Sequence, residues 1–227
     1  MTDHPSAAVV FCAGFGTRMR HLVREIPKPM VPYLGRPMVD HTVDLIRAAG
    51  INSIFANTHH HADRIEPHLD RLGVAWQREH PDILDTGGGL KALIPLLPDG
   101  PVVTINPDAA WSGPNPVDAL VTAWRAEMSC LMLLIPIAKA PRDGGGDFSL
   151  VDGKVQRRGD FVYTGAQIIR TQLVADIDET VFSLNRAWDL AIATTGIHAI
   201  VYRGDWRDIG TPEGLADIEA FASNVQA

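Results

Sequence analysis

Two glycines and an arginine near the amino end have the types and spacing needed to bind an anion. Residues 13–19 read Ala-Gly-Phe-Gly-Thr-Arg-Met and follow the apolar run Val9–Ala13. Glycines at positions 14 and 16 let the backbone approach a phosphate closely, and consecutive N–H groups in such a loop can surround an anion. The Arg18 guanidinium would add a planar fork of donors for phosphate oxygens. The segment predicts a phosphate-binding loop, and a plain turn with a surface arginine is the alternative.

A lysine between two prolines follows in the segment Ile26-Pro27-Lys28-Pro29. The prolines fix the backbone on both sides of Lys28, so its ammonium group is held at a set position. An exposed loop lysine is the alternative. Two better-known phosphate motifs are excluded, because Met19 stands where a dinucleotide fingerprint needs its last glycine, and the chain has no P-loop sequence.

Together the two segments resemble the signature of the sugar-phosphate nucleotidyltransferases, in which Gly-x-Gly-Thr-Arg-Met/Leu precedes Pro-Lys-Pro. Both parts, their order and their spacing agree with that family. The resemblance implies that Arg18 and Lys28 are catalytic: Arg18 would stabilise the departing pyrophosphate, and Lys28 would hold the α-phosphate or the incoming sugar phosphate. It also implies nucleotide contacts from the first loop, at Ala13, Gly14, Gly16, Thr17 and Arg18.

The same resemblance implies two aspartates that hold Mg²⁺. Asp108 follows a buried apolar run in the sequence Asn-Pro-Asp, where Pro107 replaces the glycine usual in the family. Asp208 lies in Trp-Arg-Asp-Ile-Gly-Thr, before the expected last helix. Mg²⁺ binds to proteins through one or two carboxylates and completes its shell with phosphates and waters. The alternatives are a turn or helix cap for Asp108 and a cap of the final helix for Asp208.

Three glycines at an expected helix start predict a pocket for the base. The segment Leu84-Asp-Thr-Gly-Gly-Gly-Leu90 would leave N–H groups free to face an anion or a base edge. By resemblance, four residues contact the nucleotide here: Pro81, Thr86, Gly87 and Gly88. A flexible helix N-terminus is the alternative.

Two later segments, Gly144–Phe148 and Tyr163–Gly165, resemble the sugar-side loops of the family. The sugar-binding candidates are Asn106, Asp147 and Gly165. Thr-Gly-Gly-Gly combined with Gly-Asp-Phe, in a chain of 227 residues, is most like the N-acetylmuramate 1-phosphate uridylyltransferases, which serve bacterial cell-wall sugar recycling. The implied reaction transfers a nucleotidyl group from a nucleoside triphosphate, UTP first, to N-acetylmuramate 1-phosphate, and releases pyrophosphate. Guanylyl transfer to mannose 1-phosphate, thymidylyl or uridylyl transfer to glucose 1-phosphate, and a catalytically silent nucleotide-sensing module are the alternatives.

The charge distribution favours a small anionic ligand. The net charge of −7 argues against a nucleic-acid surface, which needs clustered cations along a phosphate track. A basic run opposed only by Glu25 suggests a local anion site, although a solvated charged face would look the same; it comprises Arg18, Arg20, Arg24, Lys28 and Arg36. The expected partners are therefore a nucleoside triphosphate and a sugar 1-phosphate, and the oligomeric state is left open.

Neither a membrane span nor a signal peptide is expected. The apolar runs are far shorter than the roughly 20 residues that cross a bilayer, and the amino end lacks a basic flank. Cys12 and Cys130 lie in apolar runs, which indicates buried thiols and a reducing cytoplasm.

Alternating strands and helices must position these residues. Apolar runs predict strands at 9–13, 51–57, 74–77, 101–106, 130–136 and 198–202, and helical spacing predicts helices at 38–49, 62–72, 88–97, 115–126, 183–193 and 212–222. Short strands separated by Asp152-Gly153 and Arg158-Gly-Asp160 predict hairpins. We therefore expect an α/β fold, Rossmann-like with three layers and a mainly parallel sheet, in one domain over 1–227 with a small antiparallel insertion at about 140–170.

Overall fold

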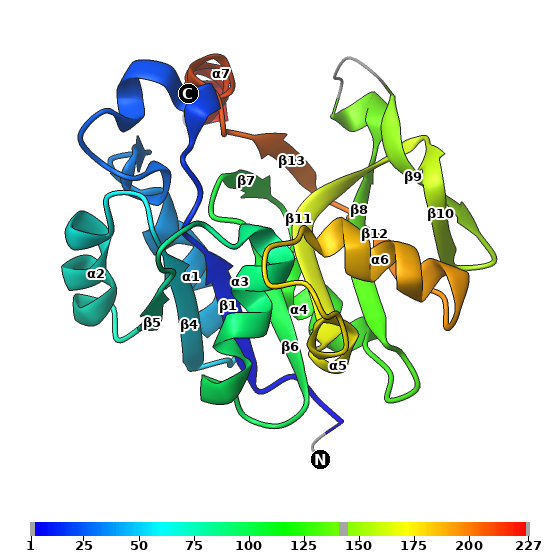
Figure 1. The fold of residues 1–227 in the computed structure, drawn as a ribbon. Coiled ribbons are helices and arrows are strands. Elements are labelled where there is room, and N and C mark those ends of the chain that lie inside the picture. The colour runs from blue at the N-terminus through cyan, green and yellow to red at the C-terminus, as the bar shows by residue number, and fades with distance from the viewer. Residues whose placement is uncertain (1–2, 141–144, 226–227) are drawn as a thin grey trace.

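A nine-stranded mixed sheet forms the centre of the molecule (Figure 1). The computed structural model describes residues 3–140 and 145–225. In sheet order the strands are β5 (Ala75–Arg78), β4 (Ser53–Thr58), β1 (Ala7–Phe11), β6 (Pro101–Ile105), β11 (Phe161–Arg170), β8 (Cys130–Pro136), β12 (His198–Val201), β10 (Lys154–Gly159) and β9 (Gly146–Val151). All residues of β6 and the first six of β8 are buried, as expected for strands covered on both faces.

Helices cover both faces of this sheet, as the alternation of side chains along β1 shows. Ala8 and Val10 belong to the core formed with α1, α2 and α4, whereas Ala7 and Val9 belong to the core formed with α3, α5 and α6. The helices are α1 (Met38–Ala48), α2 (Ala62–Arg71), α3 (Asp85–Leu93), α4 (Pro116–Ala123), α5 (Gln172–Ala175), α6 (Leu184–Ala193) and α7 (Pro212–Val225). Among the described helices, none has the length and apolarity required to cross a membrane.

The expectation of a mainly parallel sheet is wrong. β5, β4, β1 and β6 are parallel, and β12 is parallel to β8, but β11 runs antiparallel to both β6 and β8 in the middle of the sheet. β9 and β10 add an antiparallel hairpin at the far edge, joined to β12. The region expected to be an antiparallel insertion therefore includes β11, which is a central strand of the sheet. Only the β9–β10 hairpin is added at the edge of the sheet. Residues 141–144, including Gly144 of the expected sugar-side loop, lie outside the described part.

Most of the predicted elements are present within a few residues of their expected ends. The expected helix over 88–97 begins earlier, because α3 starts at Asp85 and is followed by the 3₁₀ turn η3 (Ile94–Leu96). The small sheets β2–β3 (Pro32–Tyr33 with Arg36–Pro37) and β7–β13 (Ala109–Ser112 with Asp205–Asp208) were not predicted.

A third apolar cluster joins the two ends of the chain. It packs the 3₁₀ segment η1 (Thr17–Val23) against α7 through buried side chains that include Met19, Val23, Ile209 and Leu215. Figure 1 shows α7 beside this amino-terminal segment. The first loop and the segment that follows β13 are therefore held together by burial of apolar surface.

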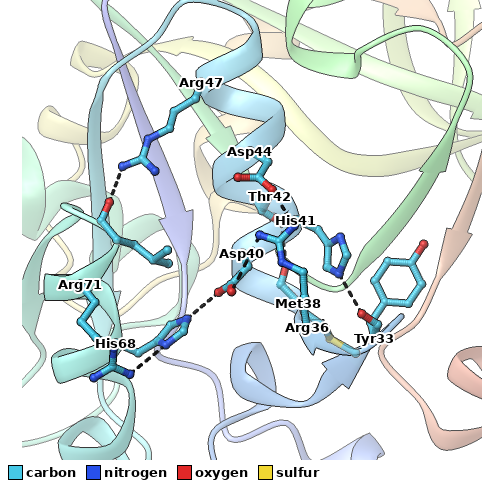
Figure 2. A network of polar contacts seen from close by, with 11 residues as sticks. Tyr33, Arg36, Met38, Asp40, His41, Thr42, Asp44, Arg47, His68 and Arg71 are labelled. Atoms are coloured by element: carbon cyan, nitrogen blue, oxygen red, sulfur yellow. Dashed lines mark hydrogen bonds and ion pairs between the residues drawn. The ribbon is translucent and has the colours of Figure 1, made fainter.

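Helix α1 is fixed by polar contacts with α2 and with the segment that precedes it (Figure 2). Asp44 accepts a hydrogen bond from Arg36 at 2.8 Å, and Asp40 pairs with His68 of α2 at 2.5 Å. His41 contacts the backbone oxygen of Tyr33 at 2.8 Å. Arg36, which belongs to the basic run, is thus used to fix α1.

A buried glutamine connects β6, β8, β11 and α6. Gln167 Nε2 donates to Thr104 Oγ1 at 3.1 Å, and Gln167 Oε1 accepts from Trp188 Nε1 at 3.0 Å and from Cys130 Sγ at 3.2 Å. Gln167 is fully buried. A buried N–H group without an acceptor is unfavourable, because it has lost its hydrogen bonds to water and gained none in return. The Gln167 amide therefore stabilises the Trp188 ring in this position.

Replacing this amide should therefore destabilise the fold. We expect Gln167→Leu to lower the free energy of unfolding by about 1–3 kcal/mol, since the Trp188 N–H is left buried without its acceptor. Urea unfolding followed by fluorescence measures the change. Gln156→Leu, at an exposed position of β10, is the control and should change stability little. Equal stability of the two variants would contradict this account.

Candidate active site

A cleft of about 280 Å³ opens at the carboxyl ends of β1 and β6. The chain leaves β1 for β4 and β5 on one side and returns to β6 on the other, and ligands of α/β sheets bind at such a reversal of strand order. All five first-loop candidates line it: Ala13, Gly14, Gly16, Thr17 and Arg18. Lys28, Thr86, Asn106 and Asp108 also line it.

The first loop brings its backbone close to the lysine segment. Gly16 has φ 62°, a conformation that favours glycine, and a Cβ added there would lie 2.8 Å from Lys28 Cβ. Pro27 is extended, with ψ 152°, and Lys28 begins the short 3₁₀ turn η2 (Lys28–Met30). The two motifs are thus in direct contact, which their separation in the sequence does not require.

Two cations and two carboxylates meet at the cleft, where Arg18, Lys28 and Asp108 are lining residues and Asp208 is reached through Arg18. Lys28 Nζ forms an ion pair with Asp108 Oδ2. Arg18 Nη1 lies 2.9 Å from Asp208 Oδ2, and Arg18 Nη2 lies 4.0 Å from Asp108 Oδ2. The Lys28 side chain is 15% exposed and that of Arg18 is 58% exposed, so Lys28 is fixed while Arg18 can turn toward a ligand. The hydrogen bond with Asp208 raises the pKa of Arg18, which stays charged.

The pairing of β7 with β13 explains how two aspartates so far apart in the sequence become neighbours. Asp208 is paired with Ala109, the residue after Asp108, and Ile209 donates its N–H to the Asp108 carbonyl at 2.9 Å. Gly210 then donates its N–H to Asp208 Oδ1 at 2.7 Å and orients that carboxylate. The side chain that caps α7 is instead Thr211, which accepts a hydrogen bond from Gly214.

Both carboxylates face one point. A Cβ added to Gly210 would lie 2.7 Å from Asp208 Oδ1 and 2.8 Å from Asp108 Oδ2, and Lys28 Nζ lies 2.7 Å from the same point. Two converging carboxylates fit a hard divalent cation that takes its other ligands from phosphates and waters. Within the described ranges, no group of three or more His, Cys, Asp or Glu side chains is placed to form a cage around a metal ion.

The basic run does not act as a unit. Arg20 pairs with Glu213 of α7 at 2.7 Å, and Arg36 pairs with Asp44 of α1 at 2.8 Å. Of the five cations in the run, Arg18 and Lys28 line the cleft. A local anion site is therefore confined to these two side chains, and the others serve the solvated surface and the packing of the helices.

A polar network that sequence reasoning missed connects the first loop to the start of α3. Asn57, at the end of β4, accepts the N–H of Cys12 at 2.9 Å and donates to Glu79 Oε1 at 2.7 Å. Glu79 Oε2 accepts the N–H of Leu84 at 2.7 Å. Asn57 also lines the cleft. The sequence offered one indication of this network, namely that Asn57 is a polar residue at the end of an apolar strand.

The expected free N–H groups at Gly87 and Gly88 are not free. Both donate to the carbonyl oxygen of Phe182, at 2.9 and 3.0 Å, and both residues are buried. A Cβ on Gly88 would lie 2.2 Å from the Thr180 oxygen, and one on Gly87 would lie 2.4 Å from the Phe182 ring. The expectation that these amides face a ligand is wrong, since the glycines instead allow α3 to pack against residues 180–182. Thr86 is the member of this segment that reaches the cleft.

A second cavity, of about 350 Å³, continues from the first. The two share four lining residues, namely Phe11, Asp85, Thr86 and Asn106. Asp147 lines the second cavity and accepts the N–H of Tyr163 at 2.9 Å. Gly165, with φ 86°, leaves space for the Asn106 side chain, and its oxygen accepts the Asn106 N–H at 2.9 Å. Pro81 and Gly165 are not among the described residues that line either cavity.

The fold and the cleft define a nucleotidyltransferase, and comparisons with known proteins agree. The chain belongs to the family of MobA-like NTP transferase domains, whose profile matches residues 8–141, and within it to the sugar-1-phosphate nucleotidyltransferases. The resemblance inferred from the first loop is thereby confirmed.

Two relatives and one solved structure are similar to this chain. The chain is 33% identical to N-acetylmuramate alpha-1-phosphate uridylyltransferase of Caulobacter vibrioides, over 97% of this chain and 98% of that protein. It is 24% identical to mannose-1-phosphate guanyltransferase of Gibberella zeae, over 90% of this chain and 61% of that longer protein. The UTP-bound UGPase of Acinetobacter baumannii has the same fold, with a TM-score of 0.81 and 16% identity, over 96% of this chain and 93% of that one.

Two glycine substitutions test which glycine is required for packing of the fold. Gly88→Ala should lower the free energy of unfolding by about 1–3 kcal/mol, because its Cβ must displace backbone near Thr180. Gly14→Ala should leave stability nearly unchanged, because a Cβ at Gly14 meets no atom within 4 Å. Thermal unfolding of both variants measures the difference. A stable Gly88→Ala protein would show that this glycine is not required for packing.

Proposed function

We propose that this protein transfers a uridylyl group from UTP to N-acetylmuramate 1-phosphate in the presence of Mg²⁺ and releases pyrophosphate. The observation that supports it best is the meeting of Arg18, Lys28, Asp108 and Asp208 at the carboxyl ends of β1 and β6. The choice of sugar and base rests on the relative from Caulobacter vibrioides, which matches this chain over nearly its whole length. A role in cell-wall sugar recycling follows from that choice.

The proposed reaction is an in-line displacement at phosphorus. An oxygen of the sugar 1-phosphate attacks the α-phosphorus of the triphosphate, the new P–O bond forms, and the bond to the bridging oxygen of the leaving pyrophosphate breaks. The attacking phosphate is already an anion at neutral pH, so the step needs no general base. Positioning and neutralisation of charge supply most of the rate.

Each charged residue has a distinct part in this proposal. Lys28, held by its prolines and by Asp108, would contact the α-phosphate or the incoming sugar phosphate. Arg18, more exposed, would turn from Asp208 to the departing pyrophosphate. Asp108 and Asp208 would then hold Mg²⁺, which when bound neutralises phosphate charge. The backbone of the first loop, at Gly14 and Gly16, would lie along the triphosphate.

A substrate panel tests the choice of base and sugar. UTP, GTP, dTTP and ATP would each be combined with the 1-phosphates of N-acetylmuramate, N-acetylglucosamine, mannose and glucose, and pyrophosphate release would be measured. We expect the highest kcat/KM for UTP with N-acetylmuramate 1-phosphate. A clear preference for GTP with mannose 1-phosphate would transfer the assignment to the activity of the Gibberella zeae relative. Absence of release with every pair would favour a catalytically silent module.

The two aspartates are tested by charge removal without change of shape. Asp108→Asn and Asp208→Asn should each lower kcat/KM by more than about 100-fold, since even outer-shell partners of a metal are worth about 10- to 100-fold. Mg²⁺-dependent pyrophosphate release is the measurement. Asp44→Asn, which removes an ion pair on α1 away from the cleft, is the control and should keep full activity. Near-normal release by both cleft variants would refute the metal assignment.

A further inference from the structure

A single arginine supplies the positive charge among the described residues that line the second cavity. Arg157 extends from β10, and its guanidinium carbon lies 5.1 Å from the centre of the Phe148 ring and 5.6 Å from that of Trp188. Aromatic faces stabilise a guanidinium without using its N–H donors. The cation is therefore held on an apolar support and is also ion-paired with Asp189 at 2.7 Å.

Three contacts fix the orientation of this guanidinium. Its Nε donates to Asp189 Oδ1 at 2.7 Å, and its two terminal nitrogens donate to the Asn185 side-chain and backbone oxygens at 2.9 and 3.0 Å. An arginine has five N–H donors, so one donor on each terminal nitrogen is left over by these contacts. Each of these remaining donors can bond to a carboxylate oxygen.

The remaining polar groups of the cavity suit a sugar ring. Asp147 and Asp85 each accept a backbone N–H, from Tyr163 at 2.9 Å and from Thr86 at 2.6 Å, which fixes their carboxylates as acceptors for hydroxyl groups. Asn106 is shared with the phosphate-binding cleft. A sugar whose 1-phosphate lies near Lys28 would thus extend past Asn106 toward Arg157. Asp189, whose side chain is 57% exposed, already pairs with Arg157, so a ligand carboxylate would share the guanidinium with it.

We propose that Arg157 binds a carboxylate carried by the sugar, so that the second cavity selects acidic sugar 1-phosphates over neutral ones. This inference rests on the proposed function and gives it a structural cause, because N-acetylmuramate differs from N-acetylglucosamine by a lactyl ether that ends in a carboxylate. Arg157 is then a specificity-determining residue and takes no part in the displacement at phosphorus.

The test compares two substrates that differ only in this group. Arg157→Gln should lower kcat/KM for N-acetylmuramate 1-phosphate by about 10- to 100-fold, the range expected for hydrogen bonds to a charged group, and mainly through KM. kcat/KM for N-acetylglucosamine 1-phosphate should change by less than about twofold, since nothing in that sugar pairs with the lost charge. Arg186→Gln, which removes an exposed arginine of α6 paired with Glu179, is the matched control and should keep the wild-type ratio.

The outcomes separate this inference from the proposed function. If the wild type prefers N-acetylmuramate 1-phosphate and Arg157→Gln keeps the same ratio, the inference is overturned and the function stands. If the wild type prefers a neutral sugar 1-phosphate, both the sugar assignment and the inference fail, while nucleotidyl transfer stands. Should Arg157→Gln not fold, the wild type alone decides: free N-acetylmuramate must inhibit more strongly than N-acetylglucosamine, and added salt must reduce the difference.

Discussion

The antiparallel pairing of β13 with β7 is the constraint on which the site depends. It aligns Asp208 with Ala109 and so brings a carboxylate from near the carboxyl end beside Asp108, which follows β6. The apolar cluster beneath η1 and α7 brings Arg18 to the same place from the amino end. Backbone pairing and burial therefore offset the cost of holding like charges close together, and neither force depends on a ligand.

The charges of the cleft balance one another in this structure. Lys28 pairs with Asp108 and Arg18 with Asp208, so the four groups sum to zero and each is stabilised by a partner. A triphosphate adds several negative charges and competes for both cations. If Arg18 turns to phosphate and Lys28 shares its charge with phosphate from its fixed position, the two carboxylates become available to a divalent ion. The proposed need for Mg²⁺ thus follows from charge balance as well as from the geometry of the two aspartates.

The sequence was sufficient for most of the central strands and their covering helices, because buried runs such as Cys130–Pro136 and the helical period of Met38–Ala48 are local signals. It was insufficient for the central antiparallel strand, since strand direction depends on a partner distant in the chain. β7 and β13 are four residues each, too short for a periodic signal. These two short strands nevertheless bring Asp108 and Asp208 together.

In the candidate site too, residues within local motifs could be predicted, whereas contacts between distant segments could not. Arg18, Lys28, Asp108 and Asp208 could be named from short motifs, because each motif carries its charged residue. Gly87 and Gly88 were misinterpreted, because a sequence shows that a glycine is present but not which neighbour would occupy the space of its Cβ. Asn57 and Glu79 were missed, since their partners at Cys12 and Leu84 come from other elements.

The two cavities are positioned by different parts of the fold, so the proposed chemistry and the proposed sugar selection would depend on different elements. The phosphate end is defined by strand ends and by β7–β13. The sugar end is defined by the other core, where Gln167 holds the Trp188 indole and that ring in turn supports Arg157. Asn106, the residue directly after β6, lies at the junction and lines both cavities. Under the proposed assignment, a change of residue at Arg157 would alter which sugar is accepted without moving the groups proposed to act on phosphorus.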